Sequence, residues 1–322
     1  AVGYASTIFP NNPDEAMDVA IALLKNPDLT IDEVVKIMPG PDFPTGGELI
    51  GAEGIKEMYA TGKGSFILRG RYTTKQLTRG RTEISFYEFP FQVSAENVTS
   101  RIQKLQKDGK LTEISSIGDF SGKSIPVKYN IVLKPGSNVS LVLNDLFSMT
   151  PLSIRLTSNN TVLDDGMPVK KGIISLFNQF LDLRKECTRN RNVKRIRDYN
   201  EKIHQNDGLI KILIDIDKVI NIIRNSETSD SAKILLKKEF KIDDNQAEYV
   251  LSLQLRKLTK SNREELISHN NDLKNELAEL NKIETNPQLF AQEIINDLLK
   301  PKAIIHDKRR TVIVGKTLEE VH

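Results

Sequence analysis

The sequence has little of what metal sites, disulfides and membrane spans are built from. It holds one cysteine and four histidines, all dispersed. One cysteine excludes an internal disulfide and fits a reducing compartment. Scattered histidines leave no cluster spaced to bind a metal ion. No run of about eighteen apolar residues exists, so we predict no transmembrane helix. The opening AVGYASTIFP also lacks the basic flank and apolar core of a signal peptide.

Net charge is also nearly absent, at +3 for 322 residues, so any basic surface has to be local. TGKGS lacks the GxxxxGK spacing of a nucleotide-binding loop. No acidic cluster is spaced for a catalytic magnesium ion. The length favours two domains, and 39% apolar content suits a protein with much exposed helix. The chain opens without methionine, as if within a domain, so we expect an excised piece.

Residues 171–206 contain no proline, and their pattern predicts one helix of roughly 54 Å. Its first half is apolar at helical spacing, whereas its second half is mostly basic. A thin apolar seam continues through the second half: Cys187, Val193, Ile196, Tyr199 and Ile203. Helices that are polar nearly all round persist when they bridge bodies or pair with another helix.

A partner for this helix is predicted at residues 261–284. It carries a seam that alternates by four and three, formed by Leu266, Leu273, Leu277 and Leu280, with Asn270 at one seam position. About sixty residues rich in isoleucine and leucine separate the two helices. We expect an antiparallel helical hairpin with a helical knob at its tip. An ordinary helical bundle is the alternative.

The N-terminal region predicts short helices and a rigid turn. Asn12 is placed to cap a helix whose first residue is Pro13, and Thr30 to cap a helix over 31–37. The stretch MPGPDFPTGGELIG, residues 38–51, has three prolines and four glycines, which fix a non-repetitive turn. Its carboxylates, Asp42 and Glu48, have no base or nucleophile beside them, so we predict no catalysis here.

The turn and the segment after it carry a family resemblance. PGPDFPTGG, then GAEGIKEMYATGKGSFILRGRY, resembles the A subunit of bacterial type IIA DNA topoisomerases, the gyrase and topoisomerase IV family. AVGYASTIFPNN, GRTEISFYEFPFQV, LNDLFSMTPL, LSLQLRKLT and DKRRT resemble further motifs of this family, in the family's order. The chain departs from it at Gly118–Ser121, where the family usually carries arginine, aspartate, glutamate and serine.

The resemblance implies an α+β fold in two parts. Residues 1–168 would form a mixed α/β tower domain and its junction with the DNA gate. Residues 169–322 would form a long antiparallel coiled-coil arm with a helical dimerisation domain, the exit gate, at about 207–260. The family's catalytic tyrosine and neighbouring arginine would lie upstream of Ala1, so we expect no catalytic residue here and no activity from this chain alone.

Basic residues around the tower strand are the candidate DNA contacts. SFILRGRYT, residues 65–73, reads as one strand with Arg69 and Arg71 on one face, and Lys63 just before it. Cations in a row can follow successive phosphates without reading bases. A solvated sheet face is the alternative, and the resemblance favours DNA contact. We interpret Tyr4 as structural and Tyr72 and Tyr87 as packing residues.

Two further patterns each allow two interpretations. The basic run 184–197 suggests a nucleic-acid helix, but a solvated coiled-coil face is favoured because acids are available on the returning helix: Glu264, Glu265, Asp272, Glu276 and Glu279. Leu251, Leu255 and Leu258 lie on more than one helix face, which indicates core packing and, given the resemblance, a dimer contact.

We therefore predict part of the A subunit of an ATP-dependent type II DNA topoisomerase, either gyrase or topoisomerase IV. The resemblance implies three partners, which are double-stranded DNA, a second copy of the chain and a B subunit, in an A2B2 complex. It places ATP and Mg²⁺ on the B subunit, with no metal site or cofactor here, and implies a cytoplasmic, nucleoid-associated location. The rival hypothesis is a structural coiled-coil protein of chromosome organisation.

Overall fold

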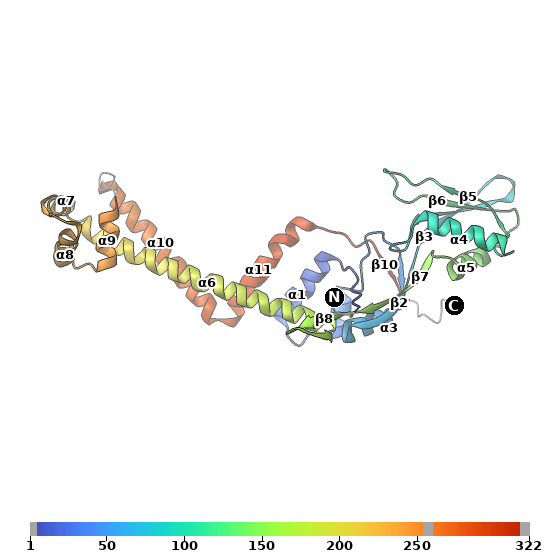
Figure 1. The fold of residues 1–322 in the computed structure, drawn as a ribbon, viewed down its shortest axis with the longest axis horizontal. Coiled ribbons are helices and arrows are strands. Elements are labelled where there is room, and N and C mark those ends of the chain that lie inside the picture. The colour runs from blue at the N-terminus through green and yellow to red at the C-terminus, as the bar shows by residue number, and fades with distance from the viewer. Residues whose placement is uncertain (1–4, 254–259, 316–322) are drawn as a thin grey trace. The chain divides into compact units, whose positions relative to one another are not determined.

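The computed structural model describes residues 5–253 and 260–315. Contacts divide the chain into two units. The first comprises Ala1–Leu181 and Asp297–His322, and the second comprises Asp182–Asn296. Both helices and strands are well represented, so the α+β class is confirmed (Figure 1). The described helices include none long and apolar enough to cross a membrane.

The described part of the chain holds eleven α-helices. Those that lie wholly in the first unit are α1 (Pro13–Lys25), α2 (Ile31–Ile37), α3 (Ala52–Thr61), α4 (Ala95–Lys107) and α5 (Val139–Met149). Those of the second unit are α7 (Ile216–Asn225), α8 (Ser229–Phe240), α9 (Asp244–Ser252) and α10 (Lys260–Thr285). Two helices, α6 (Ile173–Ile212) and α11 (Pro287–Ile305), begin in one unit and end in the other.

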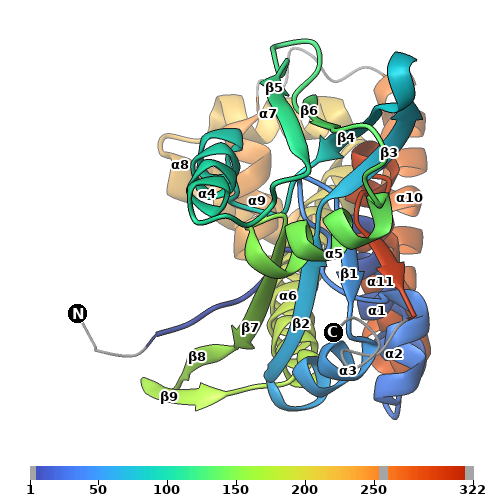
Figure 2. The ribbon, with the colours of Figure 1, turned by 90° about the vertical axis from the view of Figure 1, so that its right-hand side faces the viewer.

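The described strands all belong to the first unit. They are β1 (Glu48–Ile50), β2 (Lys63–Arg69), β3 (Arg71–Gln76), β4 (Thr82–Glu88), β5 (Ile114–Asp119), β6 (Tyr129–Leu133), β7 (Ser153–Asn159), β8 (Thr161–Asp164), β9 (Met167–Lys170) and β10 (Val312–Val314). They form an inner sheet of order β10-β1-β2-β7, an outer sheet of order β3-β4-β6-β5, and the β8–β9 hairpin (Figure 2).

The N-terminal helices begin where the sequence predicts. The Asn12 side chain accepts hydrogen bonds from the N–H groups of Asp14 and Glu15, and Pro13 is the first helical residue. Thr30 forms a reciprocal capping box with Glu33 at the start of α2. These contacts satisfy donors that a helix start otherwise leaves unpaired.

The inner sheet depends on two glycines where α3 crosses β2. A Cβ atom on Gly54 would lie 1.8 Å from the Ser65 carbonyl oxygen, and one on Gly64 would lie 2.0 Å from the Gly54 carbonyl oxygen. Any side chain at either position would force the helix and the strand apart. The glycines of GAEG and TGKG are therefore required by backbone packing.

The outer sheet is covered on one face by α4 and α5. Its apolar core joins strand residues such as Phe86 and Tyr129 to Ile102 of α4 and Leu146 of α5. The prediction of one strand over residues 65–73 is wrong. Gly70 separates β2 from β3, and the two strands belong to different sheets. The Gly70 N–H donates to the Leu152 carbonyl (2.8 Å) at this crossing.

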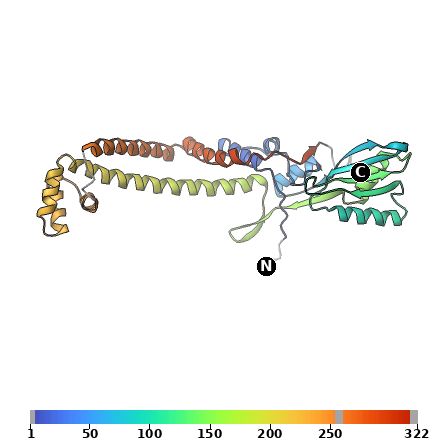
Figure 3. The same ribbon diagram turned by 90° about the horizontal axis from the view of Figure 1, so that it is seen from above.

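Within the second unit, α6 and α10 lie side by side (Figure 3). We call residues 182–212 and 260–296 of this unit the arm. Leu273 and Leu280 are buried, and so is Asn270, as the α10 pattern predicts. The seam predicted for α6 is wrong at Cys187 and Val193, which are exposed.

The helices α7, α8 and α9 form what we call the tip, which packs around a small apolar cluster. Its buried members include Val219, Leu236 and Val250, together with Leu209 and Ile212 at the end of α6. Gly208 permits α6 to approach α9 closely, because a Cβ atom there would lie 2.7 Å from the Gln246 side chain.

Candidate nucleic-acid and dimer interfaces

Of the three predicted DNA-contact residues, Lys63 is the most accessible. It is the first residue of β2 and is exposed. Gly62 ends α3 with φ 81°, and its amide donates to the Met58 carbonyl. This tight turn fixes the position at which the Lys63 side chain leaves the sheet. An exposed ammonium group at a defined position is able to contact a phosphate.

Arg69 is held against an aromatic ring. Its guanidinium lies 4.2 Å from the centroid of Phe147, a cation–π contact. Burial lowers the pKa of Arg69, with Glu48 and Tyr72 acting in the opposite direction. Its Nε atom is buried without a hydrogen-bond partner. The side chain therefore has a packing role at the end of β2.

Arg71 lies in the outer sheet, so it does not share a strand face with Arg69. Its Nη1 atom donates to Glu88 Oε1 at 3.2 Å, and its guanidinium lies 5.2 Å from the Tyr87 ring centroid. Glu88 Oε2 also accepts the Gly47 N–H at 2.7 Å. The row of cations predicted on one strand is thus divided between two sheets.

The two tyrosines interpreted as packing residues behave differently. Tyr72 packs against the core of the outer sheet, whereas Tyr87 is 39% exposed. Strand alternation could have found this difference, because Ile84 and Phe86 occupy the core face. Tyr4 lies outside the described residues.

The PGPDFPT turn and the DKRRT motif contact one another, although they lie far apart in the sequence. Asp42 Oδ1 accepts the N–H groups of Arg310 and Thr311 at 3.0 and 2.8 Å, and Oδ2 accepts the Asn12 amide at 3.0 Å. Burial opposes ionisation of Asp42, but these hydrogen bonds and the nearby Arg309 outweigh it and lower the pKa. Thr311 Oγ1 accepts the Phe43 N–H at 2.7 Å.

Arg309 completes this contact, which we call the clasp (Asn12, Glu15, residues 40–43 and 309–311). Its guanidinium pairs in a fork with Glu15, with Nε to Oε1 at 2.7 Å, and donates to the carbonyls of Gly40 and Pro41. Burial lowers the pKa of Arg309, but the Glu15 and Asp42 carboxylates reverse the direction and raise it. The clasp therefore holds the PGPDFPT turn and α1 to the DKRRT motif.

A buried polar group lies in the arm, and we call it the arm node. Asn192 is fully buried, and its Nδ2 atom donates to Glu284 at 2.9 Å and to Glu293 at 2.7 Å. Arg191 pairs with Glu293 at 2.8 Å, and Arg189 lies 3.8 Å from Glu284. Asn192 Oδ1 has no partner, and neither has Oγ1 of the buried Thr188.

Two acids that the sequence did not suggest pair with the basic run of α6. They are Glu284 and Glu293, whereas the suggested Glu279 pairs with Lys282 on its own helix. Nearer the tip, Asp207 accepts from Asn270 at 2.7 Å and from Lys274 at 2.9 Å. A buried asparagine of this kind can fix the register between two helices.

The tip exposes large apolar side chains. Ile214 is 70%, Ile234 is 66% and Leu235 is 46% exposed. Of the predicted dimer-interface residues, Leu251 is partly buried and packs against the tip cluster. Leu255 and Leu258 lie outside the described residues.

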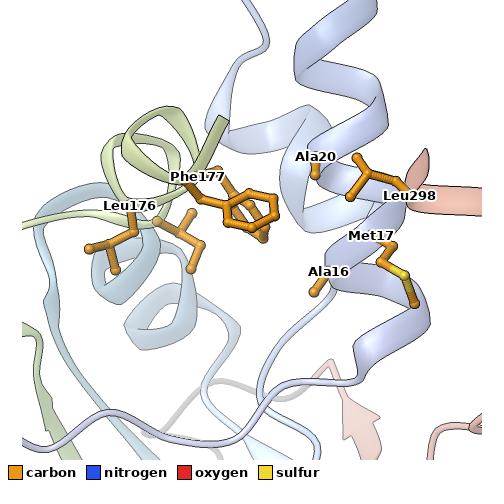
Figure 4. A pocket seen from close by; sticks show the side chains of 8 residues that line it. Ala16, Met17, Ala20, Leu176, Phe177 and Leu298 are labelled. Atoms are coloured by element: carbon orange, nitrogen blue, oxygen red, sulfur yellow. The ribbon is translucent and has the colours of Figure 1, made fainter. Parts of the chain in front are cut away.

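The described residues contain no group of three or more His, Cys, Asp or Glu side chains able to hold a metal ion. A polar cavity of about 320 Å³ in the second unit is lined by side chains that include Glu201, His204 and Tyr249. A cavity of about 280 Å³ in the first unit is lined entirely by apolar side chains from α1, α6 and α11, among them Phe177 and Leu298 (Figure 4). Such a lining offers no acid, base or nucleophile.

Comparison with known proteins defines the family. The family model for the A subunit of DNA gyrase/topoisomerase IV matches residues 1–299, and the chain belongs to this family. It is 33% identical over 321 residues to the DNA gyrase A subunit of Staphylococcus epidermidis, covering 100% of this chain and 36% of that protein.

Two further relatives agree. Identity is 34% over 319 residues to the DNA gyrase A subunit of Mycolicibacterium smegmatis, covering 98% of this chain and 38% of the relative. It is 34% over 323 residues to a probable chloroplastic/mitochondrial DNA gyrase A subunit of Oryza sativa subsp. japonica, covering 100% and 34%. The chain spans about a third of the length of these curated relatives.

Proposed function

We propose that the chain is part of the A subunit of an ATP-dependent type IIA DNA topoisomerase, which changes DNA topology by passing one duplex through another. The observation that carries this proposal is the family match over residues 1–299. Within such an enzyme, residues 1–168 would support and bend the gate DNA. Residues 169–322 would form a coiled-coil region that includes the arm and, at about 207–260, a dimeric exit gate. The DNA, the second copy and a B subunit in an A2B2 complex belong to the proposal.

The arm is proposed to be an antiparallel coiled-coil hairpin. The order of contacts supports this, because Asn192 meets Glu284 whereas Asp207, further along α6, meets the earlier residue Asn270. Buried Leu273 and Leu280 supply apolar seam positions. Asn270 at the same seam would hold the register.

The tip is proposed to join two copies of the chain. Ile214, Ile234 and Leu235 leave much of their side chains exposed, and exposed apolar surface of this kind is typical of an interaction site. Two-fold pairing would cover such surface by self-complementary contact. Leu251, Leu255 and Leu258 remain the predicted interface residues.

Duplex contact is proposed for Lys63, Arg69 and Arg71. The exposure of Lys63 supports its role most directly, whereas Arg69 and Arg71 would have to act from their contacts with Phe147 and Glu88. Phosphate contacts of this kind would give affinity without sequence preference.

A chimera tests the enzymatic proposal. Residues 1–299 would replace the matching region of the S. epidermidis gyrase A subunit, which would be combined with its own B subunit, ATP and Mg²⁺. We expect the dimeric chimera to supercoil relaxed plasmid. A folded, dimeric chimera without activity would contradict the proposed function.

DNA contact is tested by salt dependence. Replacing Lys63, Arg69 and Arg71 together by alanine should flatten the dependence of duplex affinity on salt, by up to about 0.9 log units for each phosphate that is no longer bound. Lys107→Ala on α4 is the matched control, since this exposed lysine lies outside the predicted set. An unchanged slope in the triple variant would favour a solvated face.

Dimerisation is tested by sedimentation. Leu255→Asp, Leu258→Asp and Ile234→Asp are each expected to yield monomers where the side chain faces the partner, because a buried unpaired charge opposes association. Removal of residues 207–260, closed by a short turn, should also give a monomer with an intact first unit. A dimer that survives this deletion would place the contact elsewhere.

A further inference from the structure

The outer sheet has a second face, opposite α4 and α5. Side chains alternate along each strand, so Ile84 and Phe86 of β4 and Ile131 of β6 enter the core. The residues between them therefore line the other face. This places Asn130 of β6 there, and also Lys128, which lies one residue before the strand, since Tyr129 between them belongs to the core.

One row across this face alternates cations and aromatic rings. Arg71 of β3 lies over the Tyr87 ring of β4. The β4–β6 ladder ends with the pair Phe86 and Tyr129. Extending its register by one residue places Tyr87 beside Lys128. The Phe120 N–H donates to the Lys128 carbonyl at 2.8 Å, which sets Phe120 at the far end. We call Arg71, Tyr87, Lys128 and Phe120 the aromatic row.

The Phe120 ring packs against the glycine two residues before it. The ring folds back over Gly118, where a Cβ atom would lie 2.6 Å from a ring carbon. It is nevertheless 62% exposed. The backbone thus supports a large ring and leaves most of it open to solvent.

The row of residues next to the aromatic row, on the same face of the sheet, has polar side chains and one glycine. The neighbouring row consists of Thr73, Ser85, Asn130 and Gly118. Ser85 Oγ donates to Asn130 Oδ1 at 2.7 Å, and the Asn130 amide donates to Glu83 at 3.0 Å. Glu83 is also opposite the exposed Lys75 in the ladder. The acids near the row are Glu83, Glu88 and the exposed Asp119, whose Oδ1 atom accepts the Ser121 N–H at 2.9 Å. Each thus has a hydrogen-bond partner on the protein.

We propose that this face binds single-stranded nucleic acid. Tyr87 and Phe120 would each stack on one unpaired base, while Lys128, Lys75 and Arg71 would hold the phosphates. Two strand spacings separate the rings by roughly 10 Å, too far for them to stack on each other. Exposed rings interleaved with cations are the combination that binds single strands without sequence preference. The cations provide the charge complementarity.

The proposal goes beyond duplex passage. Single-stranded nucleic acid would use a different set of side chains from duplex DNA or a protein partner. Duplex DNA presents phosphates but keeps its bases stacked, so it would use the cations and leave the rings idle. An apolar protein partner would use the rings and not the cations. Single-stranded nucleic acid alone requires both.

A tryptophan reporter tests the stacking. The chain contains no tryptophan, so Phe120→Trp would be its single tryptophan fluorophore. We expect oligo(dT) to quench this fluorescence in the full chain. Leu163→Trp on the β8–β9 hairpin is the matched control, because Leu163 is 66% exposed and lies outside the aromatic row. Equal quenching at both sites, or none at position 120, would overturn the proposal.

Affinity measurements complete the test. Phe120→Ala and Tyr87→Ala should each weaken oligo(dT) binding roughly 5- to 150-fold, and Phe120→Tyr should restore it. Lys128→Ala should reduce the salt slope by about 0.7. If duplex of equal length binds as tightly and loses as much in Phe120→Ala, duplex is the ligand and the proposal fails. Loss of activity in the gyrase chimera, with oligo(dT) binding intact, would instead overturn only the proposed function.

Discussion

The clasp and the arm node are both buried polar contacts, but they are completed to different degrees. No side-chain atom of Asp42, Arg309 or Thr311 is buried without a partner, whereas Asn192 Oδ1 and Thr188 Oγ1 are. A satisfied polar network specifies one arrangement, because every alternative breaks hydrogen bonds. A network in which some hydrogen bonds are not formed loses less free energy when it rearranges. We therefore expect the clasp to resist rearrangement more strongly than the arm node.

The largest difference is expected when an arginine is removed from each contact. Arg309→Met would leave the largely buried Glu15 unpaired, at about 3–5 kcal/mol. Arg189→Met in the arm should cost at most about 1 kcal/mol, because the Arg189 side chain is 64% exposed. Hydrogen exchange, resolved by unit, measures both. Equal losses would erase the distinction between the clasp and the arm node.

Asp42→Asn is expected to destabilise the first unit by about 1.5–3 kcal/mol at neutral pH, since a charged acceptor is replaced. The pKa of Asp42 is lowered in the folded protein. Its stabilisation is therefore present above the ordinary aspartate pKa and is lost as pH falls through the lower, folded value.

Urea unfolding of wild type and variant across this acidic range provides the measurement. The difference in unfolding free energy should shrink as the pH falls. Asp28→Asn is the control, because Asp28 is exposed, and it should change stability by less than about 0.5 kcal/mol. A difference that grows with acidification would contradict the role given to Asp42.

The smallest expected effect concerns two buried threonines, Thr150 and Thr188. Replacing each by valine should change the free energy of unfolding in opposite directions or leave it unchanged at Thr188. Thr150 Oγ1 donates to the Leu146 carbonyl at 2.6 Å and accepts the Leu152 N–H at 3.3 Å. Thr150→Val should therefore destabilise by about 1 kcal/mol. Thr188→Val removes a hydroxyl without a partner and should be neutral or stabilising by up to about 1 kcal/mol. Thermal melts of both variants decide, and a loss at Thr188 equal to that at Thr150 would show that its hydroxyl is satisfied.

Local signals in the sequence predict helices well. The caps at Asn12 and Thr30 and the seam of α10 follow from spacing and side-chain chemistry alone. The seam of α6 does not, because apolar periodicity passes over Thr188 and Asn192, the polar residues that are buried. No local sequence pattern indicates that a polar residue is buried through contact with a partner far away in the sequence.

Contacts over long sequence distances are beyond local reasoning. Asp42 and Arg310 are 268 positions apart, and neither motif indicates that it contacts the other. Gly70 looks like an interior strand residue in the sequence, although it marks the passage from one sheet to another. The aromatic row likewise depends on the order of four strands, which the sequence does not display.

The parallel pairing of β1 with β10 bears on how the protein is made. Glu48 pairs with Val312, so the inner sheet acquires its last strand only after the whole second unit has been synthesised. At about 5–20 residues per second, these 264 positions (312 − 48) take roughly 13 to 53 s to translate. During that interval the edge of β1 stays open on the ribosome, exposed to pairing with other chains. This topology therefore requires that the edge of β1 be protected from pairing with other chains until β10 has been synthesised.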